Sequence, residues 1–178
     1  TSVSVETEWP IDPLVSVAVD AESDLESFDL AIRIPSWVNT LAVRIAVNGS
    51  QRIFDAQPGS YAHLIYSPWP SGRTQVNFEL PMTLQAHRYV GADQFTGLTR
   101  YAFTVGPILL AAIGPTGGWN ITLDCLHIRR VDPTQPTSWL LRGPKALHYY
   151  IDGQDVIFKP YYAVNGNDTY ATYPAFDM

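Results

Sequence analysis

The frequency of proline and glycine is the feature that most restricts how this sequence folds. Fourteen prolines and twelve glycines are spread over 178 residues with no repeating period. Proline inside a helix removes a hydrogen bond and clashes with the preceding turn, and both residue types mark turns and loops. Long helices are therefore not expected, and many short strands are the natural alternative.

Several segments alternate apolar and polar residues, as strands with one buried face do. In residues 28–34, for example, Phe28, Leu30, Ile32 and Ile34 share one face. Further strands are predicted at 41–47, 51–55, 61–66, 74–80 and 100–105, and then at 126–130, 138–142, 146–151, 155–161 and 168–173. The apolar run at 108–113 lacks alternation and predicts a strand covered on both faces.

Turn residues separate these segments at short intervals. Asn48-Gly49 supplies the positive φ angles of a two-residue hairpin between the strands at 41–47 and 51–55. Turn signals recur roughly every 8 to 12 residues, a spacing typical of β-sandwiches. We predict an all-β chain of two consecutive antiparallel, jelly-roll-like β-sandwich units, at residues 1–84 and 85–178.

Charge and hydropathy argue against two kinds of partner. The net charge is −6 and the basic residues are dispersed, whereas nucleic-acid binding requires a basic stripe that neutralises phosphates. The longest apolar run, at 107–115, is far shorter than the ~20 residues that cross a bilayer. We expect no nucleic-acid partner and no membrane span.

The sequence also bears on the cellular location. It does not begin with Met and its first residues lack a signal-peptide pattern, so we expect a processed piece or an excerpt of a longer protein. Three glycosylation sequons begin at Asn48, Asn120 and Asn167. They favour an extracellular or secretory location.

No catalytic or metal site is predicted within this chain. Cys125 is the only cysteine, and with His127 it could in principle form a nucleophile and base or two metal ligands. We favour a small strand cysteine beside an ordinary strand histidine, because zinc needs about two more ligands. His63, His87 and His148 show no metal-ligand spacing.

The densest acidic cluster lies at 20–29, and paired carboxylates or a calcium loop are the two functional alternatives for it. Its members are Asp20, Glu22, Asp24, Glu26 and Asp29. A calcium loop needs a glycine at its turn, and this segment has none. We interpret the cluster as a solvated loop between strands.

Aromatic residues are the candidates for carbohydrate binding. Trp37, Trp69 and Trp119 lie in segments bounded by Pro and Gly, where an indole can stack on a sugar face or simply plug the end of a sandwich. Two tyrosine pairs, 149–150 and 161–162, are expected on strands. Neighbouring strand residues point to opposite faces, so one tyrosine of each pair should be buried.

Several short motifs follow one another along the chain: ETEWP (6–10), RIPSW (33–37), VNG (47–49), YAHLIYSPW (61–69), LPM (80–82), RYAFTVGPILLA (100–111), FKPYY (158–162) and TYPAF (172–176). Their order resembles the β-sandwich region of glycoside hydrolase family 127 (GH127), the β-L-arabinofuranosidase-like proteins. The resemblance covers essentially the whole chain.

This resemblance implies that the catalytic machinery lies elsewhere. Catalysis in the family is carried by an N-terminal (α/α)6 barrel with a zinc-bound cysteine nucleophile, and this chain has neither the barrel nor enough cysteines. No catalytic residue is therefore carried over, and any zinc is expected in the parent barrel, with no cofactor in this chain.

Two hypotheses follow from these observations. In the first, the chain is the non-catalytic C-terminal part of a secreted hydrolase, and it braces the barrel, shapes the sugar pocket or forms a homodimer. In the second, it is a stand-alone carbohydrate-binding or extracellular structural module. The first hypothesis also predicts a contiguous exposed apolar patch where the barrel would dock.

Overall fold

The computed structural model describes residues 1–24, 28–38, 43–54, 57–66, 70–91, 96–114, 119–120 and 125–177. These residues form strands and two short 3₁₀ helices, so the all-β prediction is confirmed. The chain divides into two compact units, Thr1–Met82 and Thr83–Met178. In the described residues, no helix has the length and apolar character that a membrane crossing requires.

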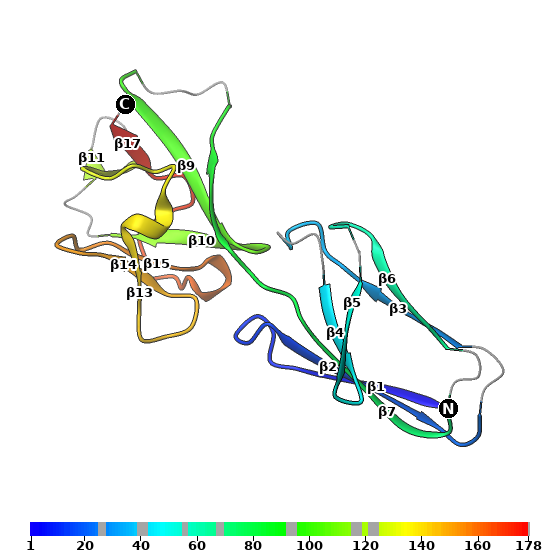
Figure 1. The fold of residues 1–178 in the computed structure, drawn as a ribbon. Coiled ribbons are helices and arrows are strands. Elements are labelled where there is room, and N and C mark those ends of the chain that lie inside the picture. The colour runs from blue at the N-terminus through cyan, green and yellow to red at the C-terminus, as the bar shows by residue number, and fades with distance from the viewer. Residues whose placement is uncertain are drawn as a thin grey trace. The chain divides into compact units, whose positions relative to one another are not determined.

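Unit 1 packs a five-stranded sheet against a two-stranded one. The larger sheet has the order β1 (Ser2–Thr7), β2 (Leu14–Ala21), β7 (Gly72–Glu79), β4 (Val43–Val47) and β5 (Ser50–Phe54). The smaller sheet pairs β3 (Phe28–Arg33) with β6 (Tyr61–Tyr66). All of these pairs are antiparallel, and Figure 1 labels the seven strands.

The core of unit 1 lies between these two sheets. β2 alternates, with Val15, Val17 and Val19 buried on one face, and β3 supplies Ile32 from the opposite layer. Period-2 alternation puts every second side chain on the same face, so short strands can build a continuous apolar layer. The sequence pattern thus accounts directly for the burial pattern.

The predicted hairpin is confirmed. Asn48 and Gly49 have φ angles of 47° and 80°, and β4 pairs antiparallel with β5 on either side of them. Positive φ at both central residues is typical of a type I′ turn, whose twist matches that of the flanking strands. Parts of the two predicted strands, at 41–42 and 55, lie outside the described residues.

Unit 2 is a ten-stranded sheet. Its path is β11 (Trp119–Asn120), β12 (Cys125–Ile128), β17 (Ala175–Asp177), β9 (Leu98–Val105), β10 (Ile108–Ile113), β15 (Ile157–Pro160), β14 (Tyr149–Ile151) and β13 (Leu140–Arg142). β8 (Leu84–Arg88) also pairs with β9, and β16 (Tyr170–Ala171) with β10. β12 and β17 pair in parallel, which corrects the expectation that every pair is antiparallel.

An aromatic cluster fills the core of unit 2. The Phe103 ring centroid lies 5.4 to 5.8 Å from the centroids of Phe158, Trp139 and Phe176, in edge-on arrangements. Phe103, Phe158 and Phe176 are fully buried. Edge-to-face contacts of this kind add about 0.5–1.5 kcal/mol per pair beyond the burial of apolar area.

In two of the segments predicted as strands, a short 3₁₀ helix takes the place of part of the strand. In the segment predicted as a strand at 138–142, a 3₁₀ turn, η2 (Pro136–Ser138), precedes the three-residue β13. The strand predicted at 155–161 ends at Pro160, and the next residues form η3 (Tyr161–Ala163). Proline has no N–H for a further ladder bond, which favours ending the strand there.

This difference in secondary structure explains the burial of the two tyrosine pairs. Tyr149 is buried and Tyr150 is exposed, as predicted for neighbours on a strand. Tyr161 and Tyr162 are both exposed, so the prediction of one buried partner is wrong for this pair. They lie in η3, where successive side chains do not alternate between two faces.

We predict that Phe103→Ala destabilises unit 2 by roughly 3–5 kcal/mol, because it removes a buried ring and leaves a cavity among three other aromatic rings. Urea unfolding followed by tryptophan fluorescence measures the change. Tyr162→Ala, at an exposed position of the same unit, serves as the control. Equal losses for the two variants would contradict the assignment of Phe103 to the core.

Candidate functional sites

The structure gives different outcomes for the three candidate tryptophans. Trp37 is half-buried, packs against the core of unit 1, and has its ring centroid 6.3 Å from that of Trp9. Trp69 lies outside the described residues, and the side chain of Trp119 does as well. The sequence analysis missed Trp9, although it lies within the ETEWP motif. One partly exposed indole pair is thus available in unit 1.

The sequons also differ in their surroundings. Asn48 is exposed, and its Oδ1 accepts a 2.8 Å hydrogen bond from the Gln75 amide. Asn167 is exposed in a turn, where its amide donates to Asn165 Oδ1 over 3.0 Å. The side chain of Asn120 lies outside the described residues. Whether any sequon carries a glycan stays a prediction.

Three described members of the acidic cluster have separate partners. Asp24 Oδ1 accepts from the Ser71 amide at 2.7 Å. Asp20 lies 3.6 Å from Arg73, and Asp29 lies 2.7 Å from His63. Among the described side chains, no three His, Cys, Asp or Glu residues gather closely enough to hold a metal ion. We therefore assign no metal ligand here.

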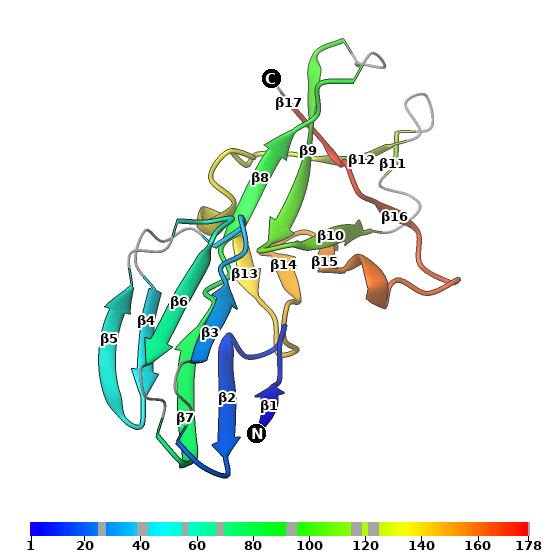
Figure 2. The ribbon, with the colours of Figure 1, turned by 90° about the vertical axis from the view of Figure 1, so that its right-hand side faces the viewer.

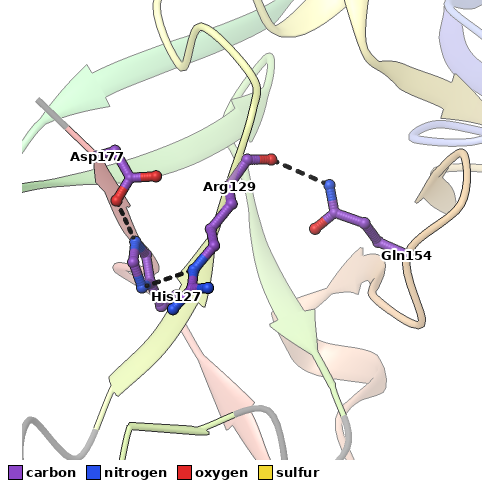
Figure 3. Close-up of polar contacts among 4 residues, drawn as sticks. All are labelled: His127, Arg129, Gln154 and Asp177. Carbon is purple, nitrogen blue, oxygen red and sulfur yellow. Dashed lines mark hydrogen bonds and ion pairs between the residues drawn. The ribbon is translucent and has the colours of Figure 1, made fainter.

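A polar cluster in unit 2 is centred on His127 of β12 (Figure 3). His127 Nε2 lies 2.8 Å from Asp177 Oδ1, and Arg129 Nε donates to His127 Nδ1 over 3.5 Å. Because arginine Nε always carries hydrogen, Nδ1 is the acceptor and Nε2 carries the imidazole proton. The Arg129 carbonyl accepts from Gln154 Nε2 at 3.2 Å.

This cluster links β12 to its neighbouring strand β17 through a side-chain contact. His127 is 11% exposed, and Asp177 comes from β17, the parallel neighbour of β12. A nucleophilic site needs a hydroxyl or thiol within reach of the imidazole. Within the described part of unit 2, the side-chain hydrogen bonds of His127 go to Asp177 and Arg129. The side chain of Cys125 lies outside the described residues.

A row of exposed or partly exposed apolar side chains crosses one face of the unit 2 sheet. The register pairs Leu141 with Tyr150 and Tyr150 with Ile157, across β13, β14 and β15. Ile157 pairs with Ile113 of β10, which also pairs with Tyr170 of β16. Leu141, Tyr150, Ile157 and Tyr170 are 40–44% exposed. We call these five residues the apolar row.

Next to the apolar row, the Tyr161 ring lies 5.7 Å from that of Tyr170, and their hydroxyls are 3.5 Å apart. The hydrogen bond to Tyr161 raises the pKa of Tyr170 above its usual value. A phenol with a raised pKa stays protonated at neutral pH, so the row carries no charge there. An uncharged surface of this kind suits an apolar partner.

The family comparison concerns unit 1. Residues 1–82 match the family model described as β-L-arabinofuranosidase, GH127 middle domain. Unit 1 is thus similar to the GH127 middle domain over its whole length. The resemblance to GH127 seen in the sequence motifs is thereby confirmed. The matched region ends where the first compact unit ends, at Met82.

Two solved structures resemble this chain over both of its units. One, a protein described as a glycoside hydrolase, is 17% identical with a TM-score of 0.65, over 99% of this chain and 32% of its own. The other, a GH127 β-L-arabinofuranosidase from Geobacillus stearothermophilus T6, is 20% identical with a TM-score of 0.58, over 98% and 30%. These likenesses show a shared fold. No curated protein sequence matched this chain.

An ion pair in unit 2 gives a test of pH dependence. Asp168 Oδ2 lies 2.6 Å from Lys159 Nζ and accepts from the Asn165 amide at 2.8 Å. These bonds, first the one from Asn165 and then the one from Lys159, lower the pKa of Asp168. The native carboxyl therefore stays ionised at pH values where the unfolded one is already protonated.

We predict that the stability contributed by Asp168 is complete above about pH 4, near the unfolded pKa, and is lost as the pH falls through the lowered native pKa. Asp168→Asn should be less stable than the wild type at pH 7, and the difference should shrink on acidification. Melting temperatures at pH 7, 5 and 3 measure this. Asp152→Asn, at an exposed turn, should follow the wild type throughout.

Proposed function

We propose that this chain is the non-catalytic C-terminal part of a secreted β-L-arabinofuranosidase-like glycoside hydrolase, in which its two units brace a catalytic (α/α)6 barrel. The match of residues 1–82 to a middle domain carries the proposal, because a middle domain belongs to a protein with further domains. Barrel residues would remove terminal L-arabinofuranose, and any zinc would be held there.

The apolar row is the surface that we assign to a protein partner. Tyrosine is enriched at the centres of protein interfaces, and contiguous apolar patches on a monomer often mark such sites. Leu141, Ile157 and Ile113 offer no hydrogen-bonding groups on their side chains, which favours an apolar protein surface over a sugar. Rim contacts to the sugar pocket and a homodimer are further roles that we propose for these units.

A secretory route also belongs to this proposal. The exposed positions of Asn48 and Asn167 are compatible with glycans on the folded chain. Mass spectrometry of the protein secreted by its native host, before and after glycosidase treatment, tests it.

The second candidate function is a stand-alone carbohydrate-binding module. The partly exposed pair of Trp9 and Trp37, with ring planes tilted by 34°, is the observation that favours it. A module of this kind should bind glycans on an array and lose binding in Trp37→Ala. The bracing role predicts little sugar affinity and little change. The coding sequence upstream of Thr1 discriminates further, since the bracing role requires a barrel there.

We predict that the 178-residue chain alone does not turn over an aryl L-arabinofuranoside, with or without added zinc, and that it binds the separately expressed barrel. Size-exclusion chromatography and calorimetry measure the association. Ile157→Lys should weaken it tenfold or more, because the variant puts a charge in the middle of the apolar row.

The matched control for this association is Asp152→Lys, which adds the same side chain at an exposed turn away from the row. It should leave the affinity within twofold of the wild type. Metal-dependent turnover by the isolated chain would overturn the proposal. An affinity for the barrel that is the same in Ile157→Lys as in the wild type would also overturn it.

A further inference from the structure

Part of the inner face of the larger sheet in unit 1 is uncovered. Val3 and Val5 of β1 pair with Val19 and Val17 of β2. Paired residues of neighbouring strands point to the same face, and Val17 and Val19 are buried in the core. Val3 and Val5 therefore face the inner side, yet they are 50% and 61% exposed.

The opposite layer ends before it reaches these valines. In the described residues it consists of β3 and β6 alone. Phe28 and Leu30 of β3 pack on Val19 and Ala21 of β2, so β3 lies over β2. Figure 2 shows β1 on the far side of β2 from β7. None of the described strands of unit 1 therefore covers the inner face above β1.

β3 offers an edge that another strand could extend. The Ile34 amide donates to the Ser60 carbonyl, on the side of β6. Because backbone groups alternate between the two edges of a strand, those of Asp29, Ala31 and Arg33 point to the other edge. In the described part of unit 1, β3 pairs only with β6. A free edge of this kind is a template for strand addition.

We infer that one further β-strand docks on the outer edge of β3 and covers Val3 and Val5. Its side chains would alternate, with small apolar residues facing the two valines and polar residues facing solvent. We assign this strand to the longer polypeptide outside residues 1–178. This source rests on the proposed function, since residues 1–82 match a middle domain and the two solved structures that resemble this chain are about three times longer than it.

Hydrogen exchange tests the inference. The amides of Asp29, Ala31 and Arg33 should exchange rapidly in the 178-residue chain and at least tenfold more slowly in the full-length protein. Nuclear magnetic resonance on the chain, and mass spectrometry with electron-transfer fragmentation on the full-length protein, resolve these positions. Equal exchange in both proteins, or slowing confined to β1, would overturn the inference.

A pair of variants isolates the uncovered face. Val5→Lys puts a charge where the added strand would lie, whereas Ser4→Lys puts it on the opposite face of β1, since Ser4 pairs with Ala18. In the full-length protein, Val5→Lys should restore rapid exchange at the β3 amides and Ser4→Lys should not. Circular dichroism of the 178-residue variants checks that both fold, because the two positions are exposed.

These outcomes are separable from those of the bracing proposal. Association of the barrel with the 178-residue chain is measured on separately expressed parts and is altered through the apolar row of unit 2. Strand docking is read at β3 of unit 1. If the β3 amides exchange slowly in the full-length protein but the barrel does not bind the 178-residue chain, only the bracing proposal is rejected. If the barrel binds but the β3 amides exchange equally fast in both proteins, only the added strand is rejected.

Discussion

This structure depends on one physical constraint, which is that each sheet must bury one of its two faces away from water. Short strands have no stability of their own, and they persist because alternate side chains are removed from water together. In unit 1 the buried layer is built largely from valines and isoleucines of regular strands. In unit 2 it is built around one group of interlocking aromatic rings. Among the described residues, Val3 and the apolar row lie on sheet faces that remain exposed, and we propose that partner segments cover them.

Strands that have a clear pattern in their own residues could be predicted from the sequence. The alternation at 28–34, the run at 108–113 and the Asn48-Gly49 turn correspond to β3, β10 and the β4–β5 hairpin. β1 and β2 were missed, although Val3 and Val5 alternate, as do Val15, Val17 and Val19. β17 was beyond prediction, because its three residues are held by β9 and β12, which are distant in sequence.

Identifying the candidate sites requires the register of the paired strands in addition to the sequence pattern. Trp37 could be selected from its loop composition, but its neighbour Trp9 comes from another segment. Tyr150 was predicted to alternate with Tyr149, but the alignment of Leu141, Tyr150 and Ile157 follows only from strand pairing. In the same way, nothing in the sequence links His127 to Asp177, whose contact depends on a parallel pair formed across the unit.

The Asn48-Gly49 turn has a chemical consequence for the lifetime of the protein. Asparagine followed by glycine is prone to lose ammonia, because the glycine nitrogen can attack the asparagine carboxamide and close a succinimide ring. Here the Asn48 carboxamide is held by the Gln75 amide, and the Asn48 amide donates to the Gln75 carbonyl at 2.8 Å. Ring closure then requires these bonds to break first. The slow appearance of isoaspartate at position 48 would therefore act as a molecular clock that counts openings of the β4–β5 hairpin.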